Sequence, residues 1–345
     1  MADWSFISHI TDYLARPRHG DEKQPTQWPS EASATILNEH GEPEVVGKCR
    51  RQAYFRLLLD SYAYSPKYKA WENLVEEIKA KSTDPDVYLR WIWKQGELYE
   101  DYCVDLAKEA GVFISGQTAV YLPEYNVSGK VDLIVIDPET QDLRIVEVKS
   151  VYGYNANSVL GTPAERKRGL LGTPREAHLM QIGIYQFWYA GRREGFGSGL
   201  LLYGARDTGR FAEYAITIEK DEIAEGQEEH FIFYQGVSPN KTAKVNSGLS
   251  IENILSNYKM IARCVDSGEI PARDYELRFD ETKITKLYER GELSKKDTEQ
   301  YEKRKKQVEE GKTRLVKAVE KGDWQCRLCS YREVCYDNSN EPREL

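Results

Sequence analysis

The sequence predicts an α/β fold, with a strand-rich core inside a shell of helices. Three consecutive segments are rich in β-branched residues and are separated by turn signals. They follow a long helical segment, and another helix and a second pair of strands come after them. This order is typical of a sheet covered by helices. The expected strands are 112–122, 127–137, 143–151, 200–205 and 211–218.

The chain before these strands is expected to be helical after an irregular start. Residues 1–46 carry many Pro and Gly turn signals, apart from a short amphipathic segment around Trp4 to Leu14. A helix is predicted from Gly47 to Tyr62 and another from about Lys67 to Lys81, because their apolar residues recur at helical spacing.

A long helix from Val87 to Ala110 is predicted next. Asp84 or Asp86 is the expected N-cap, and Gly111 ends the helix. After it, the segment Asp137–Thr140 is a turn that joins the second and third strands.

The second half of the chain is expected to be mainly helical. A loop over 152–174 precedes a helix over 175–190 and the last strand pair. From about Asp221 onward we expect helices, ending in a charged helix over 295–321 and a cysteine-rich tail.

Composition limits the functional classes. The 345 residues carry a net charge of −8, with 40% hydrophobic and 30% charged residues, which is ordinary for a soluble chain. No apolar run approaches the roughly 20 residues needed to cross a bilayer, and the first residues lack a secretion signal. We therefore expect a cytoplasmic protein with no membrane partner, including the case of a virus-encoded protein in its host. No Walker A pattern occurs, so a helicase motor is not expected.

Two carboxylates and a lysine form the central chemical pattern. Glu147 and Lys149 are two residues apart on a strand, so both project from the same face. The turn at Asp137 can bring Asp132 beside Glu147. Asp132 and Glu147 would supply oxygen ligands for Mg²⁺ or Mn²⁺, with the carbonyl of Val148 as a further candidate. Such a cluster suits phosphodiester hydrolysis, with the lysine orienting water; the alternative is a surface salt bridge between strands.

Three of the six cysteines fall within ten residues near the C-terminus, which favours a metal or cluster site over disulfides. Cys49 is the candidate fourth ligand, because it stands at a helix N-terminus among basic residues that favour a thiolate. Zinc and an iron–sulfur cluster both suit four thiolates. Cys103 and Cys264 are expected to be buried thiols. The other three candidate ligands are Cys326, Cys329 and Cys335.

The pattern Gly129-x-x-Asp132 followed by Glu147-Val148-Lys149 resembles the PD-(D/E)XK nucleases, and more closely their RecB-like branch. That branch has a Gln-x-x-x-Tyr motif on the following helix, which Gln181 and Tyr185 match. The resemblance implies a restriction-endonuclease-like mixed sheet flanked by helices, and a role for this pair in positioning DNA and the active site.

The same relatives carry a further metal ligand on the earlier helix. It is usually a histidine four residues after a glycine, and here Glu100 follows Gly96 at that spacing. This departs from the commonest pattern, although glutamate is an adequate ligand for Mg²⁺. Glu97, one turn earlier, is the competitor.

The cysteines resemble those of the iron–sulfur nucleases, and most closely the CRISPR-associated adaptation exonucleases. One cysteine before the core and three after it ligate a [4Fe–4S] cluster in those proteins. The resemblance thus implies a cluster that joins the N- and C-terminal helical parts, in preference to zinc.

The resemblance implies a Mg²⁺- or Mn²⁺-dependent deoxyribonuclease that acts as an exonuclease on single-stranded or frayed DNA ends. The alternatives are a restriction-like endonuclease working with a partner and a non-catalytic iron–sulfur DNA-binding subunit. A protein partner or homo-oligomer stays open. The expected regions are an N-terminal extension (1–46), the nuclease core with its leading helices (47–218), a mainly helical region (219–323) and a cluster-binding tail (324–345).

Overall fold

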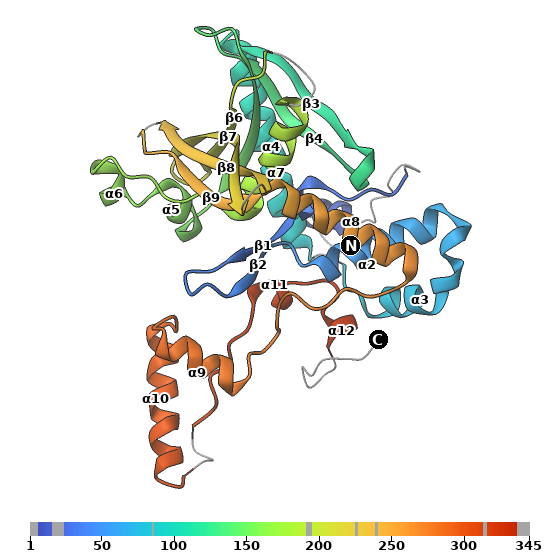
Figure 1. Ribbon diagram of the computed structural model, residues 1–345, viewed down its shortest axis with the longest axis vertical. Helices are drawn as coiled ribbons and strands as arrows, with labels where there is room; N and C mark the ends of the chain where they lie inside the picture. The colour runs from blue at the N-terminus through green and yellow to red at the C-terminus, as the bar shows by residue number, and fades with distance from the viewer. Residues whose placement is uncertain are drawn as a thin grey trace. The chain divides into compact units, whose positions relative to one another are not determined.

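The computed structural model contains a seven-stranded mixed sheet (Figure 1). Its strands follow the order β3-β4-β5-β6-β7-β8-β9; β5 and β6 are parallel, and every other neighbouring pair is antiparallel. The expected α/β class is therefore confirmed. The strands are β3 (Phe113–Leu122), β4 (Val127–Ile136), β5 (Leu143–Val151), β6 (Gly199–Ala205), β7 (Phe211–Ala224), β8 (Gln227–Ser238) and β9 (Val245–Ser250).

The chain divides into two units, and the sheet belongs to the first of them. The first unit comprises residues 1–72 and 84–271, and the second comprises residues 73–83 and 272–345. No helix in the described part of the chain is long and apolar enough to cross a membrane. The structure describes residues 6–15, 24–84, 86–190, 195–224, 227–238, 241–312 and 316–336.

Seven helices and a small hairpin accompany the sheet among the described residues of the first unit (Figure 1). The hairpin pairs β1 with β2 in antiparallel register. The elements are α1 (Phe6–Ala15), β1 (Ser33–Leu37), β2 (Pro43–Gly47), α2 (Arg50–Tyr64), α4 (Val87–Glu109), α5 (Tyr154–Leu160), α6 (Pro163–Lys167), α7 (Glu176–Ala190) and α8 (Ile251–Ser267).

The sheet is covered on both faces around β5. Ile145 and Val151 belong to the main core together with the apolar residues of α7. Val146 and Val148, which have the opposite parity, pack with Tyr99 and other residues of α4. Since successive strand residues face opposite sides, α7 and α4 lie on opposite faces of β5. A charged side chain in the middle of this strand is therefore removed from water.

Local sequence signals explain the start of α4. The side chain of Asp86 accepts a hydrogen bond from the backbone N–H of Tyr88 at 2.9 Å, as an N-cap does. Of the two expected capping residues, Asp86 is thus the one used. The turn at Asp137 is also present, because its carboxylate accepts the N–H of Glu139 at 3.0 Å.

The second unit is mainly helical. The rings of Tyr288 and Tyr301 lie 4.4 Å apart between α9 and α10, around a small core that contains Ile284, Leu293 and Val319. Its helices are α3 (Glu72–Lys81), α9 (Glu281–Glu289), α10 (Lys295–Glu309), α11 (Trp324–Arg327) and α12 (Arg332–Cys335). The first residue of α3, Glu72, belongs to the first unit.

The expectation that residues 219–323 are mainly helical is wrong up to residue 250. β7 continues to Ala224, and β8 and β9 extend the sheet. Glu228 and Glu229 make the start of β8 polar, which hid the strand. Farther along, Ile232 is fully buried in the main core.

Two other boundaries differ from expectation. The helix expected from Gly47 begins at Arg50, because Gly47 ends β2 with φ +93° and a Cβ there would lie 2.4 Å from the carbonyl oxygen of Ala32. The charged helix ends at Glu309, two residues before Gly311 with φ +71°. Trp4, residues 313–315 and residues 337–345 of the expected tail lie outside the described residues.

Candidate active site

The β4–β5 hairpin brings the two expected carboxylates onto neighbouring strands. Leu133 pairs with Val146 in antiparallel register, so Asp132 and Glu147 are the next residues on their strands. The backbone N–H of Val148 donates a hydrogen bond to Oδ2 of Asp132 at 2.8 Å. This bond fixes the Asp132 carboxylate across the two strands.

Glu147 is the most deeply buried member of the site. Its side chain is 1% exposed, and Nζ of Lys149 lies 2.6 Å from its Oε1. Its other oxygen, Oε2, is buried and makes no hydrogen bond with any described residue. Buried carboxylate oxygens normally have a hydrogen-bond partner. The Oε2 atom of Glu147 can therefore accept one more bond.

Burial and mutual repulsion shift the pKa values of this group. Burial raises the pKa of Glu147 to about 8. The positive charge of Lys149 opposes this rise, and the negative charge of Asp132 adds to it. Burial likewise raises the pKa of Asp132, although Lys149 and the Val148 N–H oppose it. Burial alone would lower the pKa of Lys149, but the charges of Glu147 and Asp132 raise it overall, so the ammonium stays protonated.

Helix α4 brings Glu100 into electrostatic reach of this group. A Cβ at Gly96 would lie 3.7 Å from Oγ of Ser150, so the helix passes close to β5 one turn before Glu100. Burial, followed by the repulsion of Asp132, raises the pKa of Glu100 to about 7. The competitor Glu97 instead lies 2.7 Å from Nζ of Lys94.

The three carboxylates are neighbours without forming a closed ligand set. The oxygens of Asp132, Glu147 and Glu100 do not all lie within 4.8 Å of one another. Binding one ion through all three therefore requires a side-chain rotation, and the half-buried Glu100 has the most room to make it.

Tyr185 and Gln181 support β4 from the opposite helix. The hydroxyl of Tyr185 donates to the carbonyl of Lys130 at 2.9 Å, and the ring is 2% exposed. A Cβ at Gly129 would lie 2.8 Å from that hydroxyl and 2.8 Å from Cδ of Pro29. Burial and the charge of Glu147 raise the pKa of Tyr185, while its hydrogen bond with Gln181 acts in the other direction. Tyr185 thus positions the strand that carries Asp132, and glycine is needed where α7 and β4 approach.

His178 is a site neighbour that the motif analysis missed. Its Nδ1 lies 2.9 Å from the hydroxyl of Tyr203. Burial lowers its pKa well below the usual value, and the positive charge of Lys149 lowers it further, so the ring is neutral. Its place one turn before Gln181, on the same face of α7, is the sequence signal that points to it.

The cysteines divide between the two units. Cys326 lies in α11, Cys335 ends α12 and Cys329 lies between them, whereas Cys49 is the N-cap residue of α2 in the first unit. Within the second unit, Arg273 donates to the carbonyl of Cys335 at 2.7 Å. The shared ligation of a cluster stays a prediction.

The two remaining cysteines have environments that keep their thiols protonated. Burial, followed by the charges of Asp132 and Glu100, raises the pKa of Cys103 to about 11. Burial and the charge of Glu269 raise the pKa of Cys264. The raised pKa values favour the protonated thiols, and both side chains are only partly buried rather than fully buried as expected.

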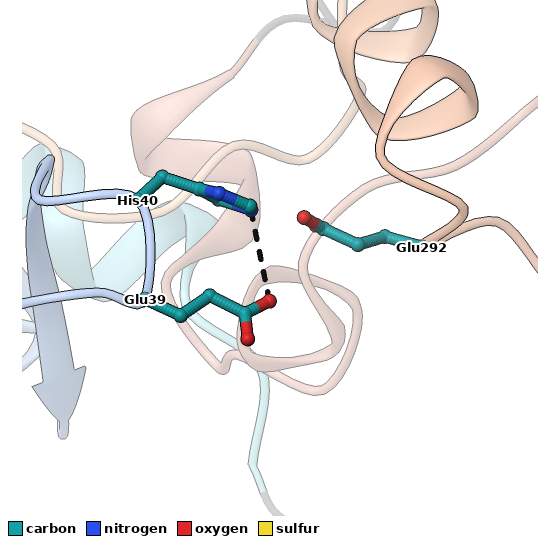
Figure 2. Close-up of side chains that lie close together, drawn as sticks. All are labelled: Glu39, His40 and Glu292. Atoms are coloured by element: carbon teal, nitrogen blue, oxygen red, sulfur yellow. Dashed lines mark ion pairs between the residues drawn. The ribbon is translucent and has the colours of Figure 1, made fainter.

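A separate histidine–carboxylate pair lies at the turn between β1 and β2. Figure 2 shows Nε2 of His40 next to Oε1 of Glu39, at 3.6 Å. Figure 2 also draws Glu292, which belongs to the second unit. Both residues of the pair are exposed, and exposed acidic groups of this kind are common without a metal.

Comparison of the chain with protein-family models, with curated proteins and with solved structures finds no match.

Proposed function

We propose that the protein is a metal-dependent DNA nuclease of the PD-(D/E)XK type, with a restriction-endonuclease-like core. The observation that carries the proposal is Glu147, a buried carboxylate with one oxygen on Lys149 and the other without a partner. A purely structural ion pair would leave no acceptor unsatisfied at this depth.

The donor set suits a hard divalent cation. Asp132, Glu147 and Glu100 offer carboxylate oxygens, and the carbonyl of Val148 is a further candidate ligand. Their raised pKa values reflect negative charge crowded into a dry site, which a bound cation would relieve. When bound, Mg²⁺ or Mn²⁺ polarises the phosphate and lowers the pKa of a water ligand.

The other residues act on charge and position. Lys149 keeps its proton, so its ammonium stabilises the negative charge that develops on phosphate oxygens and orients the attacking water. Tyr185 holds the carbonyl of Lys130 and thereby the strand that carries Asp132. The preferred substrate is single-stranded or frayed DNA, cut from its ends.

An iron–sulfur cluster is the second part of the proposal. Four cysteines, three of them within ten residues in the second unit, offer a ligand set of thiolates. A cluster that also binds Cys49 would close a loop of most of the chain, which reduces the freedom of the unfolded state. Its role would be structural, because phosphodiester hydrolysis transfers no electrons. The remaining ligands in this proposal are Cys326, Cys329 and Cys335.

Incubation with matched linear and circular single-stranded DNA tests the activity and its type. We expect Mg²⁺ or Mn²⁺ to support cleavage of the linear strand only, and EDTA to stop it. Cleavage of the circle would show an endonuclease instead. Failure of the anaerobically purified protein to cut either substrate with either metal would refute the proposal.

A further inference from the structure

The segments after β5 and β6, the first of which contains α5 and α6, form one continuous surface beside the candidate active site. The two strands are parallel, and Val151 pairs with Ala205 at their carboxyl ends. The N–H of Arg206 donates to the carbonyl of Val151 at 3.0 Å, and the N–H of Gly153 donates to Asp207 at 3.2 Å. Crevices at the carboxyl ends of parallel strands are common ligand sites in α/β sheets.

Two tyrosines stand out from this surface. Tyr152 is 64% exposed and Tyr154 is 88% exposed, one on each side of Gly153 with φ +60°. Neither hydroxyl makes a hydrogen bond with any residue that the structure describes. An exposed aromatic ring offers a face on which any nucleic-acid base can stack.

The two segments that form this surface are basic in sequence, although the chain as a whole is acidic. Residues 152–168 and 206–211, which we name the basic rim, contain five basic and two acidic side chains in a chain of net charge −8. Among the described residues, the side chain of Arg206 bonds only to Oε1 of Gln95, and the side chain of Arg210 bonds to the neutral groups of Thr208, Gly161 and Asn157. No carboxylate in the described part of the chain pairs with these two guanidinium groups, so both can attract phosphate.

We propose that the basic rim binds single-stranded DNA, with bases stacked on Tyr152 and Tyr154 and phosphates held by Arg206 and Arg210. This inference rests on the proposed nuclease function and deepens it by assigning residues that receive the strand. Tyr152 is three residues beyond Lys149, about 10 Å along an extended chain, so a strand bound at the site reaches it within a few nucleotides.

Stacking selects single strands over duplexes. In a duplex the base faces are covered by neighbouring base pairs, so a protein ring has access only to an unpaired base or to an end. Phosphate contacts alone would hold either form. The tyrosines therefore supply the preference for single-stranded or frayed ends, and the arginines supply affinity without sequence preference.

Fluorescence anisotropy with a short labelled oligothymidylate in EDTA tests the inference without cleavage. Tyr152→Leu is expected to weaken binding between about 5-fold and about 100-fold, whereas Tyr152→Phe retains the ring and the affinity. Tyr64→Leu, at a tyrosine that is 53% exposed at the end of α2, is the matched control and should bind as the wild type does. Arg206→Ala should reduce the salt dependence of binding by about 0.7 in log–log slope.

An abasic oligomer of the same length separates stacking from other effects. The wild type should bind it more weakly than oligothymidylate, and Tyr152→Leu should add no further loss on the abasic strand. Equal loss on both strands, or no loss on either, would overturn the stacking assignment. These measurements use binding alone, so they are independent of cleavage. A protein that shows the expected stacking but never cuts DNA would refute the nuclease function and support the assignment of the basic rim.

Discussion

Replacing Glu100 by glutamine should stabilise the metal-free protein at neutral to basic pH while impairing its activity. Burial and Asp132 raise the pKa of this carboxyl from its ordinary value of 4.5 to about 7. A carboxyl with a raised pKa costs nothing below pH 4.5, and stability is lost as the pH rises through the folded-state value. The Gln variant has no such loss, so its advantage should grow between about pH 4.5 and pH 7.

The size of the effect follows from the shift. A rise in pKa from 4.5 to about 7 corresponds to about 3 kcal/mol for a fully buried group. Because Glu100 is half-buried, solvent screens part of this, and we expect about 1–2 kcal/mol above pH 8.

Thermal unfolding in EDTA at pH 5 and pH 8.5 measures this gain, with Glu97→Gln as the control one turn earlier. Glu97 pairs with Lys94 on the surface, so its replacement should change stability by less than about 0.5 kcal/mol at either pH. Adding saturating Mg²⁺ should reverse the order, because only the wild type keeps the full ligand set. At a Mg²⁺ concentration 100 times the dissociation constant, the wild type should gain about 2.7 kcal/mol.

Two results would refute this reasoning. One is a stability difference between Glu100→Gln and the wild type that is the same at pH 5 and pH 8.5. The other is a larger pH-dependent gain in Glu97→Gln, which would mean that the neighbouring helix turn faces the site.

Two further predictions concern packing and the cysteines. Gly129→Ala should destabilise the protein by about 1–3 kcal/mol in urea unfolding, because its Cβ would overlap Tyr185 and Pro29. Adding Tyr185→Phe to this variant should recover part of that loss. An unchanged stability of Gly129→Ala would contradict the close approach. Iron and sulfide analysis of six anaerobic Cys→Ser variants should show loss of iron for four and full iron for Cys103 and Cys264; zinc in place of iron, or iron loss at Cys103, would contradict the cluster. The four expected ligands are Cys49, Cys326, Cys329 and Cys335.

The strands that carry the site were predictable from the sequence because their signals are local. Alternating β-branched residues and the Asp137 turn fix β4 and β5, and the spacing of Glu147 and Lys149 fixes their common face. The approach of Glu100 to Asp132 followed only from the family resemblance, because it depends on how α4 packs. The alternative residue, Glu97, has the same local sequence character.

Long-range packing explains what was missed. β8 begins with acidic residues and is held by its pairing with β7, so nothing in its own first residues marks it as a strand. Similarly, the contact between His178 and Tyr203 depends on how β6 packs against α7, so no local pattern shows it. The β1–β2 hairpin lies in a segment that carries turn signals, which masked its two short strands.

The most direct test of the nuclease assignment compares wild type with Glu147→Gln in Mg²⁺-dependent cleavage of end-labelled linear single-stranded DNA. Glutamine has nearly the same shape as glutamate and keeps an oxygen that can accept from Nζ of Lys149, so we expect the variant to fold. A cooperative unfolding transition verifies that it is folded. We expect the wild type to cut the strand with Mg²⁺ and not with EDTA, and the folded variant to be inactive under both conditions. Cleavage by a folded Glu147→Gln variant at the wild-type rate would contradict the assignment of this carboxylate, and with it the active site proposed around it.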